Sequence, residues 1–128
     1  MLLKGPSELL DIAEFILGLL EVGYVKANFK YTKKDEYSEC HLNRDGSFTI
    51  LIESDLECEK ATVRHMAHEI THLKQFKRDE LRNDEYGVFW KGELYHMGEH
   101  CSDEYFLSPW EMEARALEDW ILYRWESK

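Results

Sequence analysis

The sequence predicts an α+β fold in a single domain of residues 1–128. Apolar residues recur at helical spacing at both ends of the chain and in its middle, whereas they alternate in parts of residues 25–52. A length of 128 residues suits one hydrophobic core. We therefore expect an N-terminal helix, a small antiparallel sheet of about three strands, a long central helix and a C-terminal helix.

The first helix should begin at Pro6-Ser7 and end before Gly23. Its apolar residues are spaced three or four positions apart, which places them on one face. They are Leu9, Leu10, Ala13, Ile16, Leu17 and Leu20. Acidic residues interrupt this apolar run, so we expect a surface helix of a folded domain and not a secretion signal or membrane span.

Three strands are predicted next. In residues 25–31 apolar and polar side chains alternate, which is typical of a half-buried strand. Residues 40–44 and 47–52 have strand-like composition and are separated by Asp45-Gly46, a pair that favours tight hairpins. We expect these segments to form the antiparallel sheet.

The central helix is expected to start at a capping box formed by Ser54 and Glu57, and to end near Arg78 or Leu81. Its predicted buried stripe consists of Ala61, Met66, Ile70, Leu73 and Phe76. Residues 82–107 have no helical period and contain several aromatic residues and glycines, so an ordered loop or irregular hairpin is expected there. A second capping box, Ser108 to Glu111, should open a C-terminal helix that runs from Pro109 to about Trp125.

The charge of the chain limits its partners. It has 26 acidic and 16 basic residues and a formal net charge of −10. Nucleic acids and anionic membranes are bound mainly by lysine and arginine, so the sequence predicts neither as a partner. Three cysteines without CxxC spacing make a disulfide framework unexpected and favour a cytoplasmic location.

Residues 68–72 form the pattern H-E-x-x-H on the central helix. Residues four apart share a helix face, so His68 and His72 can bind one metal ion. Glu69 is rotated to the side of this pair, where it can act as general base on a zinc-activated water.

A catalytic zinc usually has three protein ligands, and the C-terminal helix offers Glu111 and Glu113 for the third. On a helical wheel Glu113 lies at the edge of the apolar face, where a carboxylate needs a partner. Glu111 lies on the far side with Arg115 and Glu118, and the capping box already accounts for it. The wheel therefore favours Glu113, while Glu111 stays open.

The HEITH sequence of residues 68–72, followed by PWEMEA at residues 109–114, resembles the gluzincin branch of the zincin metallopeptidases. It is most similar to small zincin-like domains often encoded by bacteriophages, over about residues 57–120. The resemblance implies a compact α+β zincin fold, bound Zn²⁺ and a peptidase-type site. Related zincins carry a Glu-x-x-Ala pattern whose Glu is a ligand, which fits Glu111 with Ala114 and also Glu113 with Ala116. The Asp or Asn that follows this Ala in several families is absent here.

The expected function is a zinc metallopeptidase that cleaves a peptide or protein substrate in the cytoplasm, or in a host cytoplasm if phage-encoded. Two alternatives remain: a zinc-binding interaction module of zincin fold without turnover, and an acidic decoy that binds a basic partner. His96 or His100 is the main rival to a Glu as third ligand, and His100 or Tyr105 is a candidate for substrate contact. His65 is expected to be a partly solvated residue without a catalytic part.

Overall fold

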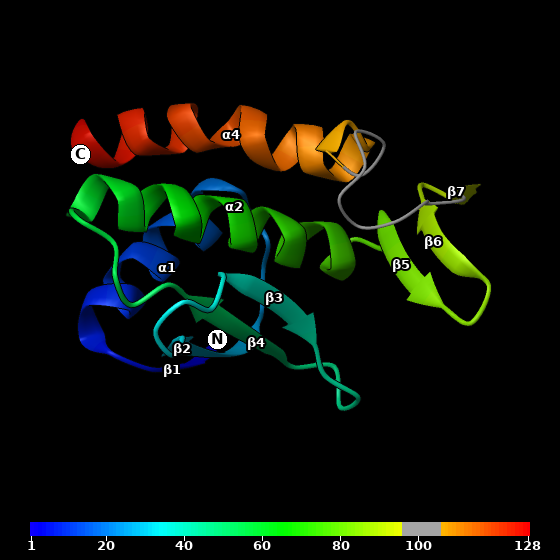
Figure 1. Ribbon diagram of the computed structural model, residues 1–128, viewed down its shortest axis with the longest axis horizontal. Helices are drawn as coiled ribbons and strands as arrows, with labels where there is room; N and C mark the ends of the chain where they lie inside the picture. The colour runs from blue at the N-terminus through cyan, green and yellow to red at the C-terminus, as the bar shows by residue number, and fades with distance from the viewer. Residues whose placement is uncertain (96–105) are drawn as a thin grey trace.

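The computed structural model describes residues 1–95 and 106–128, and these residues form a mixed α+β fold (Figure 1). The α+β class predicted from the sequence is thereby confirmed. Within the described residues there is a four-stranded sheet, a separate three-stranded sheet and three helices. The helices are α1 (Ser7–Leu19), α2 (Glu59–Lys77) and α4 (Pro109–Glu126). None of them is long and apolar enough to cross a membrane.

The larger sheet is mixed, which corrects the expected three-stranded antiparallel sheet. Its strand order is β1-β2-β4-β3, and only the hairpin of β3 and β4 is antiparallel. The strands are β1 (Leu2–Lys4), β2 (Lys26–Tyr31), β3 (Glu39–Leu42) and β4 (Phe48–Ile52). Alternating polarity reveals a buried face but not strand direction, and β1 has three residues, too few to show a period. The helix α1 provides the crossover that parallel pairing of β1 with β2 requires.

The core lies between this sheet and the helices α1 and α2. Alternate residues of β2 and β4 are buried, as predicted for half-buried strands. The predicted stripe of α2 is confirmed at Met66, Ile70 and Leu73, which are fully buried. On the side of α2 away from the sheet, α4 runs alongside it (Figure 1). The helix α2 is therefore covered on two sides, which brings its polar face into contact with α4.

The side-chain cap hydrogen bonds expected of the two predicted capping boxes do not form. The helix α2 begins at Glu59, with Cys58 as N-cap and without a side-chain cap. Ser54 and Asp55 instead form a turn after β4, and the following Leu56 packs against the core. The helix α4 does begin at Pro109, but no side-chain cap hydrogen bond forms at its N-terminus.

The segment after α2 forms a small antiparallel sheet, consistent with the expected irregular hairpin. Its strands, in sequence and spatial order, are β5 (Leu81–Asp84), β6 (Gly87–Trp90) and β7 (Glu93–Tyr95). The rings of Trp90 and Tyr95 lie 6.3 and 5.6 Å from the ring of Trp110, measured between centroids. These contacts hold the small sheet against the first turn of α4, next to the histidine pair of α2.

Candidate metal site

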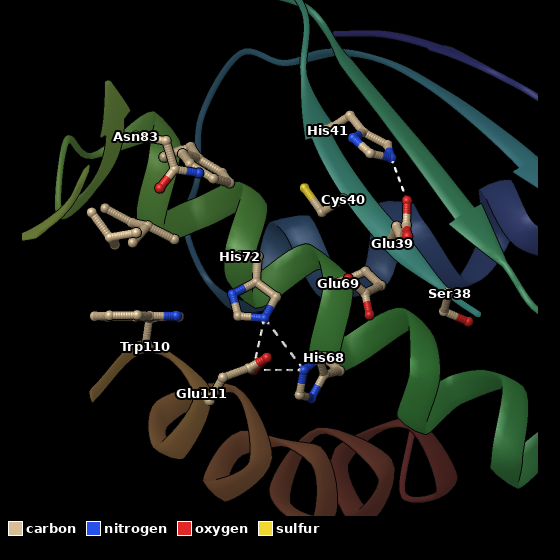
Figure 2. Close-up of a pocket in the computed structure, with 13 residues that line it drawn as sticks. Ser38, Glu39, Cys40, His41, His68, Glu69, His72, Asn83, Trp110 and Glu111 are labelled. Atoms are coloured by element: carbon tan, nitrogen blue, oxygen red, sulfur yellow. Dashed lines mark hydrogen bonds and ion pairs between the residues drawn. The ribbon is translucent and has the colours of Figure 1, made fainter. Parts of the chain in front are cut away.

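His68 and His72 lie one turn apart on α2, as the H-E-x-x-H pattern predicts. Their Nε2 atoms are 3.3 Å apart and both rings are partly buried. Because residues i and i+4 share a face of an α-helix, the two imidazoles point to the same place (Figure 2). The helix α2 thus brings together two nitrogen atoms that can bind the same metal ion.

Glu111 completes this cluster from the first turn of α4. Its Oε2 lies 3.1 Å from the Nε2 of His68 and 3.1 Å from the Nε2 of His72 (Figure 2). A tetrahedral zinc ion with bonds of about 2.0–2.1 Å spaces its ligand atoms about 3.3 Å apart. The three distances fit this spacing, and two imidazoles with one carboxylate form a typical catalytic zinc set. Among the residues that the structure describes, no other group of three side chains is arranged for a metal ion.

Glu113 does not join the cluster, so the structure corrects the wheel argument that favoured it. Its Oε1 lies 2.7 Å from Lys74 Nζ and 3.0 Å from Gln75 Nε2. The wheel considered only the apolar face of α4, whereas the face that carries Glu111 packs against the polar face of α2. Glu111 is 6% exposed, and the capping role assigned to it does not occur.

Two further residues, which the sequence analysis did not assign to the site, contact the outer nitrogens of the histidines. Glu118 Oε2 lies 3.0 Å from His68 Nδ1, and Gln75 Oε1 lies 2.8 Å from His72 Nδ1. Outer partners of this kind fix the tautomer and orientation of metal-binding histidines. A signal for Glu118 was present in the sequence, because it is seven residues from Glu111 and shares its helix face. Gln75 is three residues after His72, a spacing that makes the two side chains neighbours on α2.

The histidines and carboxylates of the cluster shift one another's pKa values. Burial lowers the pKa of His68, but hydrogen bonds to Glu111 and Glu118 outweigh this effect and raise the pKa to about 10. Burial raises the pKa of Glu111, but its hydrogen bonds to His68 and His72 hold the pKa well below its ordinary value. In the absence of metal, the cluster therefore retains a proton on His68 at neutral pH.

Glu69 lies beside the histidine pair and is 7% exposed (Figure 2). Burial is the main cause that raises the pKa of its carboxyl to about 7. The nearby His72 and His68 lower that pKa, and the carboxylates of Glu111 and Glu39 raise it. A carboxyl group with this pKa can both accept and return a proton near neutral pH.

The cluster opens into a pocket of about 450 Å³ between α2, α4, β3 and the small sheet. At one end, Trp110 and Asn83 lie near His72 (Figure 2), and the lining also includes the apolar side chains of Phe76, Leu81 and Val88. At the other end it is polar and comes from β3 and the residue before it: Ser38, Glu39 and His41, with Cys40 between them. A substrate group that enters the pocket would meet the histidines and Glu69 between these two ends.

The other candidate residues lie outside the cluster or outside the described residues. His65 contacts Ser38 Oγ through its Nδ1 at 2.9 Å and is not part of the metal cluster. His96, His100 and Tyr105 fall within residues 96–105, which the structure does not describe.

Comparisons with known proteins identify no relative. No family model, no curated protein and no solved structure matches the chain.

Proposed function

We propose that this chain is a zinc metallopeptidase in which His68, His72 and Glu111 hold the metal ion. The single observation that supports this most strongly is the position of Glu69. Its buried carboxyl shares one pocket with the three convergent ligand atoms. A site that only held a structural metal would not need an additional proton acceptor there.

Zinc bound by these residues would supply Lewis acidity, which polarises a substrate carbonyl and makes water a stronger nucleophile. Glu69 accepts the proton of the attacking water, and it later donates this proton to the amine that leaves. The histidines and Glu111 position the metal, and Glu118 and Gln75 orient the histidine rings.

The substrate in this proposal is a peptide or protein. The pocket combines an apolar end with a polar, partly acidic end. The net charge of −10 favours substrates that are not strongly acidic. We place the activity in the cytoplasm, because the described cysteines Cys40 and Cys58 are free thiols.

The direct test is Glu69→Gln, with Glu59→Gln as its control on the same helix. Glu59 lies in the first turn of α2, is exposed and accepts a hydrogen bond from Trp125. Each protein is incubated with a broad peptide mixture in H₂¹⁸O, so that every new carboxyl terminus acquires the label. We expect Glu69→Gln to retain zinc and lose about 10²–10⁴-fold in cleavage rate, and the control to cleave normally.

Equal cleavage by Glu69→Gln and the wild type would contradict the assigned base. Zinc binding without cleavage of any peptide by the wild-type protein would instead support the interaction module of zincin fold. A chain that binds no zinc but binds basic proteins in a salt-sensitive manner would support the acidic decoy.

A further inference from the structure

A buried polar cluster lies between α2 and α4, directly behind His72. It contains Lys74, which is 6% exposed, Gln75, which is fully buried, and Glu113. Burial of a lysine and an amide is unfavourable unless their polar atoms are paired. Hydrogen bonds join these side chains to one another and to the backbone, and they compensate for the burial of the polar groups.

The amide group of Gln75 is held in one orientation. Its Nε2 donates to the backbone oxygen of Trp110 and to Oε1 of Glu113, both at 3.0 Å. These two acceptors match the two hydrogens of the amide nitrogen. Its Oε1 therefore faces the opposite way and lies 2.8 Å from Nδ1 of His72.

This orientation decides which nitrogen of His72 is available to a metal. An oxygen opposite Nδ1 requires that Nδ1 carry the hydrogen, which leaves the lone pair on Nε2. Nε2 is the atom that faces His68 and Glu111. With the amide reversed, the nitrogen of Gln75 would face Nδ1, and the hydrogen of neutral His72 would move to Nε2, where it would block coordination.

We infer that Glu113, held by Lys74, is a positioning residue that locks the Gln75 amide and thereby presents His72 Nε2 for metal binding. This inference rests on the proposed metal site. It gives Glu113 an indirect role, through Gln75 and His72, in place of the direct ligand role that the sequence favoured.

Glu80 offers a matched control, because it is the second carboxylate that pairs with Lys74. The Nζ of Lys74 lies 2.7 Å from Glu113 Oε1 and 3.2 Å from Glu80 Oε1. The second contact is an ion pair without hydrogen-bond geometry. Glu80→Ala therefore removes a carboxylate partner of Lys74 but leaves the contact between Glu113 and Gln75 in place.

The test measures zinc affinity by competition with a chromogenic chelator, together with folding by circular dichroism. We expect Glu113→Ala and Gln75→Met to bind zinc about 10–100-fold more weakly than the wild type. Glu113→Gln should stay within about threefold, because an amide oxygen still accepts from Gln75 and Lys74. Glu80→Ala should lower stability without a change in zinc affinity.

Three results would overturn the inference. Unchanged affinity in Glu113→Ala shows that the residue is dispensable, and equal losses in Glu80→Ala and Glu113→Ala show a purely structural effect. Equal losses in Glu113→Gln and Glu113→Ala point to a direct ligand, since a carboxylate ligand cannot be replaced by an amide without loss.

A measurement on the wild-type protein does not depend on any variant. In the zinc-bound protein, long-range ¹H–¹⁵N spectra should show the hydrogen of His72 on Nδ1, and coordination through Nδ1 would contradict the inference. Absence of zinc binding by the wild type would refute the metal site and the inference together. Absence of cleavage, with the expected order of affinities, would refute only the peptidase proposal.

Discussion

Glu118 should control how tightly the site holds zinc, although it is not placed as a ligand. Its Oε2 accepts a hydrogen bond from His68 Nδ1 across 3.0 Å. Removal of an outer carboxylate of this kind typically costs 10–100-fold in metal affinity. The two side chains are 21% and 25% exposed, so water partly compensates for the loss. For Glu118→Ala we therefore expect a loss of about 10–30-fold, equivalent to about 1.4–2 kcal/mol.

The assay measures zinc affinity by competition with a chelator at fixed pH, with Asp119→Ala as the control variant. Asp119 is the next residue on α4, is 82% exposed in its side chain and pairs with Arg64 at the surface. It contributes a similar negative charge at a similar distance along the helix but does not contact His68. We expect its zinc affinity to stay close to that of the wild type. Equal affinities for the two variants would refute the orienting role of Glu118.

Three further predictions concern zinc, protons and the backbone. Zinc at 100 times its dissociation constant should add about 2.7 kcal/mol, or about 10 °C in Tm for this chain length, and Glu111→Ala should abolish the increase in a thermal melt. Because the pKa of His68 is raised from 6.5 to about 10, the metal-free protein retains this proton until the pH approaches 10. Zinc binding at pH 8 should therefore release about one proton, which calorimetry in buffers of different ionisation enthalpy measures, and no release would contradict it. Gly5 has φ +145°, and a Cβ there would lie 2.5 Å from Phe29 O, so Gly5→Ala should cost more than about 2 kcal/mol in chemical unfolding. Gly18→Ala, in open space on α1, should be neutral or stabilising by up to about 1 kcal/mol.

Helix periodicity predicted the helices well, because the buried stripe of a helix recurs within one short window. The centres of α1, α2 and α4 follow from the sequence, and so does the hairpin of β3 and β4 with its Asp45-Gly46 turn. The helix starts were less predictable, because tertiary contacts decide between a cap and a turn. Leu56 packs against the core in the segment before α2, and the helix begins only at Glu59.

The topology of the sheet could not be predicted from the same patterns. Parallel and antiparallel strands with one buried face have the same alternation. An antiparallel sheet was expected, yet β4 lies between β2 and β3 and pairs with β2 in parallel. This arrangement leaves β3 at the edge of the sheet, where it lines the pocket next to Glu69.

The candidate site was predictable where one helix supplied it and ambiguous where two helices meet. His68, Glu69 and His72 share α2, so spacing alone placed them together. The choice between Glu111 and Glu113 depends on how α4 rotates against α2, which a wheel of α4 alone does not contain. The seven-residue spacing of Glu111 and Glu118 would have been the better guide.

The most direct test of the central claim is the zinc content of purified protein after exhaustive dialysis, measured by elemental analysis. The wild type should retain about one zinc per chain, and Glu111→Ala, with an unchanged circular dichroism spectrum, should retain almost none. Wild-type protein without zinc, or a Glu111→Ala variant that retains a full equivalent, would contradict the proposed site.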